Sequence, residues 1–274
     1  MGLGPTKTGA FTALVPCLPM FFSTWETYHT HTLFLGYFNG PTEGLMIACS
    51  IMVISGYYGP QIWTYRIADV IGYGEFFNDL SFRDLWVPIL LFSFFVAHLP
   101  DCIRNVVKAR RSANLPILPV FLDWTPMLVY CLSIGAWLFS PYSSLLSHNR
   151  LVLFCLTMSF VFGRLTTKII LHHLVHQPFP YWTVMLVPLI GGAILANLPR
   201  FGLPAISPVA EVWYLRGYFV FALTAYTHWA LVTIDRICTF LDINCLTIKK
   251  RKIDPKEELK ELVKAAKERN GRQA

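Results

Sequence analysis

The sequence has little charge for its length. Only 14% of its 274 residues are Asp, Glu, Lys or Arg, whereas 54% are hydrophobic and 15% are aromatic. A soluble domain usually has about 25% charged residues, so this composition excludes a single water-facing globule. We predict an integral membrane protein. The formal net charge of +7 does not point to nucleic acid, because no polar basic domain is present to bind it.

Several short catalytic signatures are missing as well. The sequence contains no GxSxG, no P-loop, no GxGxxG followed by an acidic residue, no HExxH and no CxxC. These are the marks of hydrolases, nucleotide-binding enzymes and zinc or redox sites. No Asp-Gly dipeptide occurs anywhere. The seven Cys are odd in number and lie in or beside apolar runs, which predicts reduced packing residues and not a disulfide framework.

Long apolar runs dominate the sequence instead. A transmembrane helix needs about 20 predominantly apolar residues. Seven runs are candidates for such helices: 9–24, 44–61, 85–103, 117–140, 151–171, 182–199 and 212–241. The first run is short and contains Pro16 and Pro19. The fourth contains Asp123 and Pro126, so we expect it to be broken or to start late. We predict an all-α, polytopic membrane helix bundle of about seven transmembrane helices.

Lys and Arg gather at alternate ends of these runs. The third run is followed by Arg104, Lys108, Arg110 and Arg111. The end of the fifth run contains Arg164 and Lys168, and the tail opens with the KKRK cluster over 249–252. The loops at 141–150 and 200–211 are poorer in basic residues. Because cytoplasmic ends of membrane helices are enriched in Lys and Arg, we place the three basic ends in the cytosol. Alternation puts the connection between the first two runs there too.

We divide the chain into a membrane helical domain over residues 1–248 and a basic cytosolic tail over 249–274. The tail predicts a short helix, because Asp254 suits its N-cap, Pro255 its first turn and Glu257 a capping box. A narrow apolar stripe among its Lys and Glu residues fits a helix in solvent or on the membrane surface. Docking of a partner is the alternative.

The stretch STWETYHTHTLFLGYFNGPTEG, Ser23 to Gly44, is the most unusual part of the sequence. It gathers aromatic rings, His, Glu and Asn in the connection between two apolar runs. Rings alone suit a membrane interface, but ionisable groups near membrane depth usually face a cavity or a ligand. Aromatic rings beside a carboxylate suit an ammonium head group. A ligand-facing role and simple anchoring of a loop are both open.

The end of this stretch, NGPTEG, supplies a Gly-Pro turn before a helix. We expect Thr42 to cap that helix and Glu43 to lie in its first turn.

A second polar cluster is GRLTTKIILHHLVHQPFP, Gly163 to Pro180. His172 and His176 are four residues apart, which predicts one helix face and a spacing that suits a metal. No carboxylate follows in this segment. The cluster therefore fits helix-end charge next to lipid phosphate, direct contact with a phosphate group or, third, a zinc site.

The run STWETYHTHTLFLGYFNGPTEG closely resembles the stretch that follows the catalytic motif in eukaryotic choline and ethanolamine phosphotransferases. These belong to the CDP-alcohol phosphatidyltransferase family, and the fungal type is the nearest match. YGPQIW (Tyr58 to Trp63), GRLTTKIILHHL with QPFP downstream, and TFLDINCLTIKK near the end have counterparts there in similar form and order. The resemblance covers roughly residues 3–250, and the opening run is its most specific part.

The resemblance implies a phospholipid-biosynthesis transferase. The family moves phosphocholine or phosphoethanolamine from CDP-choline or CDP-ethanolamine to diacylglycerol. Its fold is a bundle of about ten membrane helices, of which this chain resembles the last seven. It further implies Mg²⁺ as cofactor, a homodimer, and a location in the membrane of the endoplasmic reticulum or Golgi. For substrate binding it favours six residues: Trp25, Glu26, Tyr28, His29, Asn39 and Glu43.

The family's catalytic motif is not in these 274 residues. The motif is Asp-x2-Asp-Gly-x2-Ala-Arg-x8-Gly-x3-Asp-x3-Asp, and its carboxylates hold the metal against the CDP diphosphate. We expect this chain to be the C-terminal part of such an enzyme and to be inactive alone, with no catalytic or metal-binding residue assigned within it. The alternative is a non-catalytic membrane partner or regulator of the full-length enzyme.

Overall fold

The structure, a computed structural model, describes residues 2–33, 41–67 and 81–248. These segments are helical and contain no strand, although Arg66 and Ser81 form one isolated antiparallel bridge. The chain divides into two units, Met1–Tyr226 and Thr227–Ala274. The predicted tail helix, over 249–274, lies outside the described residues. The predicted all-α class is confirmed in the described part of the chain.

The first apolar run forms two consecutive helices, α1 (Lys7–Leu14) and α2 (Cys17–Thr30). Thr6 caps α1 by accepting a hydrogen bond from the Gly9 amide at 3.1 Å. Pro16 lies between the helices and has no N–H to continue the first one. α2 ends where His31 adopts a left-handed conformation, φ 55°. The predicted connection was therefore wrong over residues 23–30, which are helical.

The second run forms α3 (Pro41–Tyr58), followed by the 3₁₀ helix η1 (Pro60–Thr64). Glu43 lies in the first turn of α3, as expected. The helix starts at Pro41, so Thr42 lies inside it and not at the predicted cap position.

The third run forms one long helical segment with a wide turn in it. α5 (Phe82–Ser93) leads into a π-helical turn, η3 (Phe94–His98), and then into α6 (Leu99–Ser112). Pro100 lacks an N–H, and just before it the Leu99 amide bonds to the Phe94 carbonyl, five residues back. The basic residues after position 103 were predicted in a connection, which is wrong because they lie on the last turns of α6.

The fourth and fifth runs form η4 (Leu118–Trp124), α7 (Thr125–Leu138) and α8 (Leu151–Leu174). The predicted break in the fourth run is confirmed, because a 3₁₀ helix occupies its first part and α7 begins beside Pro126. Asp123 lies at the end of that 3₁₀ helix.

The remaining runs form α9 (Leu186–Leu195), the short 3₁₀ helix η5 (Leu198–Phe201) and α10 (Pro208–Leu241). In the described residues, four helical segments are long and apolar enough to cross a membrane: Phe82–Ser112, Leu118–Leu138, Leu151–Leu174 and Pro208–Leu241. Two shorter apolar helices are Met46–Tyr58 and Leu186–Leu195. The protein is therefore a polytopic membrane helix bundle.

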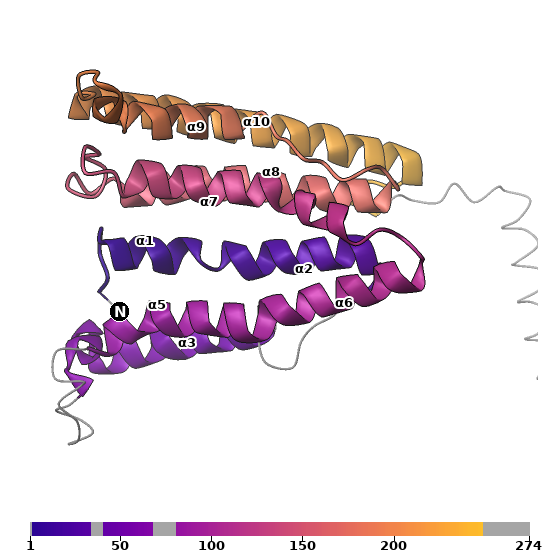
Figure 1. Cartoon of the computed structure of the whole chain (residues 1–274), viewed down its shortest axis with the longest axis horizontal. Helices are drawn as coiled ribbons and strands as arrows, with labels where there is room; N and C mark the ends of the chain where they lie inside the picture. The colour runs from indigo at the N-terminus through magenta and orange to yellow at the C-terminus, as the bar shows by residue number, and fades with distance from the viewer. Residues whose placement is uncertain (1, 34–40, 68–80, 249–274) are drawn as a thin grey trace, which may run out of the picture. The chain divides into compact units, whose positions relative to one another are not determined.

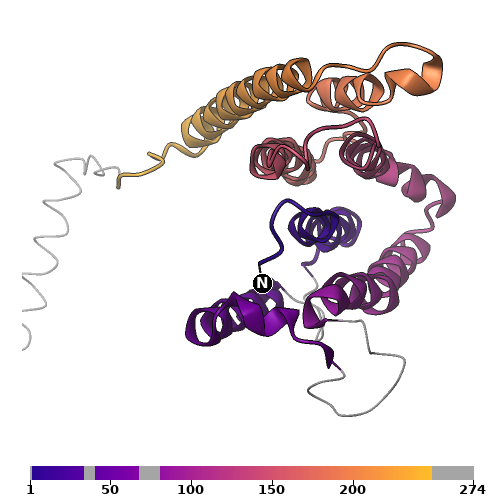
Figure 2. The same cartoon turned by 90° about the vertical axis from the view of Figure 1, so that its left-hand side faces the viewer.

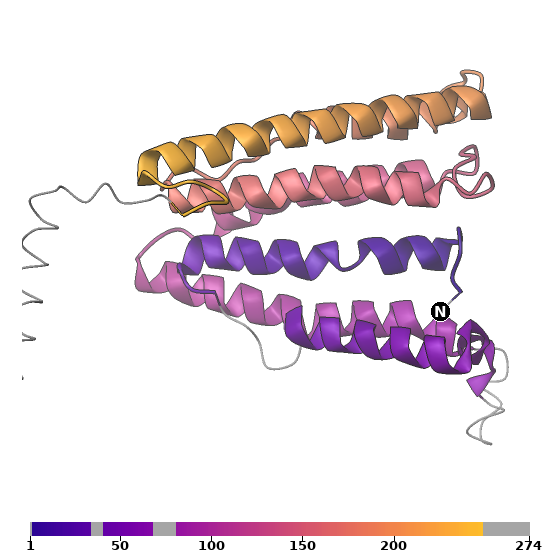
Figure 3. The same cartoon turned by 180° about the vertical axis from the view of Figure 1, so that it is seen from behind.

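Within the first unit, α1 and α2 form the central pair. Figure 2 shows them almost end-on, with α5 and α6 on one side and α7 and α8 on the other. α2 contacts both α6 and α8, whereas α7 packs most extensively on α9 (Figure 1). The core around this pair contains fully buried rings of Phe21, Trp25, Tyr130, Trp137 and Phe154. The ends of α2, α6 and α8 consequently come together at one end of the unit (Figure 3).

Candidate functional site

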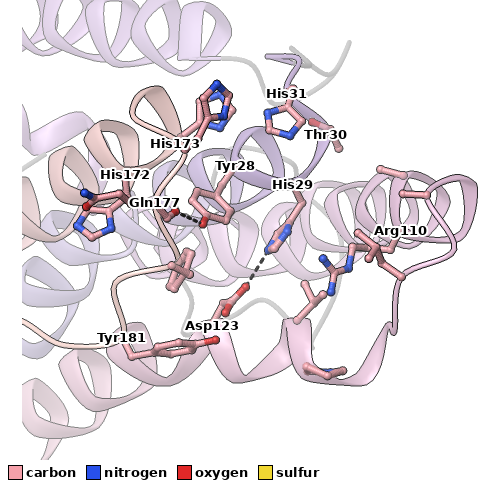
Figure 4. A pocket seen from close by; sticks show the side chains of 17 residues that line it. Tyr28, His29, Thr30, His31, Arg110, Asp123, His172, His173, Gln177 and Tyr181 are labelled. Atoms are coloured by element: carbon pink, nitrogen blue, oxygen red, sulfur yellow. Dashed lines mark hydrogen bonds and ion pairs between the residues drawn. The ribbon is translucent and has the colours of Figure 1, made fainter.

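A pocket of about 580 Å³ lies where α2, α6, η4 and α8 end or begin. Five segments supply its walls: residues 28–31, 109–115, 119–123, 172–177 and 179–181. Figure 4 shows the side chains around it. Natural ligand pockets have volumes of about 300–1,000 Å³, so this pocket is large enough for a polar head group.

An acid–base pair forms one wall of the pocket. His29, near the end of α2, and Asp123, at the end of η4, lie with Nε2 and Oδ2 2.7 Å apart (Figure 4). The exposed fractions of the two side chains are 9% and 4%. The contact is a hydrogen bond that becomes an ion pair when the imidazole is protonated. It joins residues 94 positions apart and so fixes η4 against α2.

Aromatic rings surround this acid–base pair. The Tyr28 ring contacts Phe179 edge-on, with centroids 5.2 Å apart, and its hydroxyl donates to the Gln177 carbonyl at 2.7 Å. Tyr181 extends its hydroxyl toward Asp123 (Figure 4). Partial burial and then the negative charge of Asp123 raise the pKa of Tyr181 above its ordinary value. The carboxylate therefore acts on the atoms that face the pocket.

The flanks of the pocket carry basic groups. The rings of His31 and His173 stack, with centroids 4.9 Å apart and planes inclined by 27°. His172 Nδ1 lies 2.8 Å from the Pro178 carbonyl, which holds the chain segment after α8. On the other flank, Arg110 donates to the Pro116 carbonyl from Nε at 3.2 Å and from Nη2 at 3.0 Å. Arg110 thereby orders the connection between α6 and η4 while its cationic head stays at the pocket.

The predicted shared helix face of His172 and His176 is wrong. α8 ends at Leu174, and His176 follows in a left-handed conformation with φ 52°. Among the residues that the structure describes, no group of three or more His, Cys, Asp or Glu side chains could hold a metal ion. Both His nevertheless line the pocket, so the cationic end predicted from this cluster lies at the pocket.

The four substrate-binding candidates on α2 have different surroundings. Tyr28 and His29 face the pocket. Glu26 is only 3% exposed and accepts a hydrogen bond from Asn105 Nδ2 on α6 at 2.7 Å. Trp25 is fully buried between Phe22, Phe121 and Trp124. Glu26 thus tethers α2 to α6, and Trp25 supports the wall behind the pocket.

The other two candidates are not placed. Asn39 lies outside the described residues, and of Glu43 the structure describes only its position in α3. Their predicted roles stay predictions.

Asp123 was predicted only as part of a break in the fourth apolar run and not as a site residue. A signal was present, since a carboxylate inside an apolar run usually faces a cavity or a partner. Arg110 and Tyr181 were also missed, because nothing in their local sequence indicates which distant segment they meet. Their convergence depends on packing between segments up to 94 positions apart.

Comparison with known proteins identifies relatives of the chain. No protein-family model matches the sequence. The chain is 28% identical over 258 residues to CDP-alcohol phosphatidyltransferase class-I family protein 3 of Dictyostelium discoideum, covering 85% of this chain and 61% of that protein. It is 28% identical over 248 residues to choline/ethanolaminephosphotransferase 2 of Arabidopsis thaliana, covering 87% and 62%. It is also 28% identical over 280 residues to cholinephosphotransferase 1 of Saccharomyces cerevisiae, covering 90% and 64%.

The chain thus spans about three-fifths of the length of the curated relatives that it matches. This coverage is consistent with a part of such a protein. The relatives confirm the resemblance that the sequence motifs indicated, and the chain is homologous to the CDP-alcohol phosphatidyltransferases, choline/ethanolaminephosphotransferases among them.

Proposed function

We propose that this chain is the substrate-binding part of a CDP-alcohol phosphotransferase of phospholipid synthesis. In this function a phosphocholine or phosphoethanolamine group moves from a CDP-alcohol to diacylglycerol. The observation that carries the proposal is the charged, aromatic-lined pocket at one end of apolar membrane helices, in a homologue of choline/ethanolaminephosphotransferases. Such a reaction joins a water-soluble donor to a membrane-embedded acceptor, so its site belongs at the end of a membrane bundle.

The end of α2 is the part of the chain that we assign to the substrates. Tyr28 and His29 supply side chains to the pocket, and Trp25 and Glu26 hold the helix in place from behind. Asn39 and Glu43 follow in the same sequence stretch, and we retain them as proposed contacts of the head group.

The described residues around the pocket do not form a magnesium site. The carboxylates near the site, Glu26 and Asp123, pair separately with Asn105 and His29. Mg²⁺ demands several oxygen ligands in near-octahedral geometry, which this arrangement does not offer. We propose that the metal ligands of the family do not come from the described residues, and that the chain alone does not turn over substrate.

A transferase assay in membranes tests the proposal. The chain would be expressed in cells without their own choline/ethanolaminephosphotransferases, alone and joined to the segment of Saccharomyces cerevisiae cholinephosphotransferase 1 that the match does not cover. Labelled CDP-choline or CDP-ethanolamine and diacylglycerol are supplied. We expect labelled phospholipid from the joined protein and none from the chain alone.

Two outcomes would count against parts of this proposal. A joined protein that is folded and monodisperse but makes no product contradicts the transferase assignment. Product from the chain alone contradicts the requirement for outside carboxylates. The second candidate function is a non-catalytic membrane partner or regulator of a full-length enzyme. Co-purification with a full-length relative would support that candidate.

The cellular setting follows from the same assignment. We propose the membrane of the endoplasmic reticulum or Golgi, with the pocket and the C-terminal tail facing the cytosol, because the basic ends of α6 and α8 lie at the pocket end of the bundle. We also propose a homodimer, which the family resemblance implies. Protease protection of a C-terminal tag in sealed microsomes tests the orientation.

A further inference from the structure

The pocket at the ends of α2, α6 and α8 contains both signs of charge on separate walls. Asp123 is a carboxylate with 3% exposure that lines a cavity instead of packing in the core. Burying a charge is costly unless it is paired, and His29 is its partner. Among the described residues that line the pocket, Asp123 is the single acidic side chain.

The side chains next to Asp123 suit a cation. Tyr28, Phe179 and Tyr181 bring three aromatic rings to the same wall. The faces of aromatic rings attract an ammonium group within about 6 Å, and a carboxylate adds Coulomb attraction and accepts hydrogen bonds from N–H. This wall therefore offers both kinds of contact that an organic ammonium makes.

The flanks suit an anion. Arg110 is a permanent cation on one flank, and His31, His172, His173 and His176 also line the pocket. Phosphate oxygens accept hydrogen bonds from such groups, most strongly from the planar guanidinium. A simple anion would meet the Asp123 carboxylate unfavourably, and a simple amine would meet Arg110 unfavourably. A ligand with both charges fits both walls.

We infer that Asp123, with the rings beside it, is the specificity determinant for the ammonium of the proposed zwitterionic head group, and that Arg110 takes the phosphate of that head group. Asp123 is the residue that recognises the ammonium. The inference rests on the proposed function for the relevance of this ligand class, but the binding itself does not need turnover. The head group comes from one of two sources, a soluble CDP-alcohol or a membrane phospholipid.

Equilibrium binding to the 274-residue chain in lipid nanodiscs tests the inference. The probes are phosphoethanolamine, ethanolamine and inorganic phosphate, measured by calorimetry in nanodiscs of phosphatidylglycerol. We expect phosphoethanolamine to bind at least about tenfold more tightly than either fragment, since each wall contributes one charge-assisted contact.

Two variants, each of which removes one charge, separate the walls. Asp123→Asn keeps the side-chain volume and a hydrogen-bond acceptor for His29, and we expect it to weaken phosphoethanolamine binding by about tenfold while binding of phosphate is unchanged or stronger. Arg110→Gln should weaken phosphate and phosphoethanolamine alike. The matched controls are Asp101→Asn and Arg111→Gln, exposed residues of α6 that do not line the pocket, and both should bind as the wild type does.

The source of the head group is decided by competition. Nanodiscs of phosphatidylethanolamine should suppress phosphoethanolamine binding if the pocket takes lipid, whereas CDP-ethanolamine should displace the probe in either lipid if the pocket takes the donor. Both results support the inference. It is overturned if phosphoethanolamine binds no better than phosphate, or if folded Asp123→Asn binds it as the wild type does. A loss of transferase activity with intact binding would fault the proposed function and not this site.

Discussion

Asp123 and Glu211 are both buried carboxylates, but they differ in their hydrogen-bond partners and surroundings. Glu211, in the first turn of α10, is 2% exposed and accepts four hydrogen bonds at 2.7 to 3.0 Å, from the indole of Trp137, the hydroxyl of Ser143 and both the amide and hydroxyl of Ser144. Asp123 is 3% exposed, pairs with His29 and lies at a pocket. Burial is thus equal, and only the surroundings differ.

The difference indicates two roles for one kind of group. Both oxygens of Glu211 accept hydrogen bonds from neutral donors, which belong to Trp137 of α7 and to Ser143 and Ser144 after it. This carboxylate therefore fastens the start of α10 to α7 and to the segment between α7 and α8. Asp123 faces rings and space that a ligand can fill. Buried polar groups without partners are costly, so the first carboxylate is expected to matter for stability and the second for binding.

The largest expected effect comes from removing Glu211. Glu211→Ala leaves the Trp137 indole and the Ser143 and Ser144 donors without their acceptor, and each orphaned donor costs about 1–3 kcal/mol. We expect the free energy of unfolding to fall by about 3 kcal/mol or more. Thermal unfolding in detergent, followed by size-exclusion fluorescence, measures it. Glu211→Gln should restore part of the loss, and an unaltered unfolding temperature in Glu211→Ala would contradict this role.

The contact between Trp137 and Gly192 allows a second test of the packing around Glu211. The Trp137 ring, which donates to Glu211, also packs on Gly192 of α9 so closely that an added Cβ would overlap it. Gly192→Ala should therefore cost about 1–3 kcal/mol of unfolding free energy.

Gly217→Ala is the matched control for this glycine. A Cβ at Gly217 of α10 meets nothing within 4 Å, so the helix should become slightly more stable. Equal unfolding temperatures for the two variants would show that the Trp137 contact is not as tight as described.

Asp123→Asn should reverse the pattern seen at Glu211. Because Asn keeps an acceptor for His29 and the volume of the side chain, we expect a loss of about 1 kcal/mol or less in unfolding free energy. Head-group binding should fall instead. If Asp123→Asn lost as much unfolding free energy as Glu211→Ala, both carboxylates would be stabilising groups and the contrast would be wrong.

The smallest expected effect is a change in the titration of Tyr181. Its pKa is raised by burial and by Asp123, so the folded chain holds this proton more tightly than the unfolded chain does. The resulting stability is present below the ordinary pKa of 10.0 and is lost as the pH rises through the raised value. Asp123→Asn should lower the pKa of Tyr181. Tyrosinate absorbance, taken as the difference from Tyr181→Phe, reports it, and an unchanged titration would mean that the carboxylate does not act on this hydroxyl.

The helices were predictable because their signal is local. Runs of about 20 apolar residues identify membrane helices whatever their neighbours are, and each of the seven predicted runs contains a helix. Among the described residues four helical segments are long and apolar enough to cross a membrane, so the number of about seven transmembrane helices stays a prediction. The ends of the helices were less predictable. α2 continues to Thr30 and α6 to Ser112, because a helix can extend beyond its apolar part when its polar turns pack on other helices.

The site was predictable only where its residues share one stretch of sequence. Tyr28 and His29 were named because rings and an imidazole stand together in the first polar stretch. Asp123 was not named, although a carboxylate inside an apolar run was a signal, because its partner His29 lies 94 positions away in the sequence. Glu211 escaped notice for the same reason, since its donors come from a segment 67 to 74 positions earlier.

The most direct test of this account is the ratio of phosphoethanolamine dissociation constants between Asp123→Asn and the wild-type chain, with Asp101→Asn as the reference. The account predicts a ratio of about ten or more for Asp123→Asn and about one for Asp101→Asn. A ratio near one for both variants, in folded protein, would contradict the assignment of Asp123 to ammonium recognition.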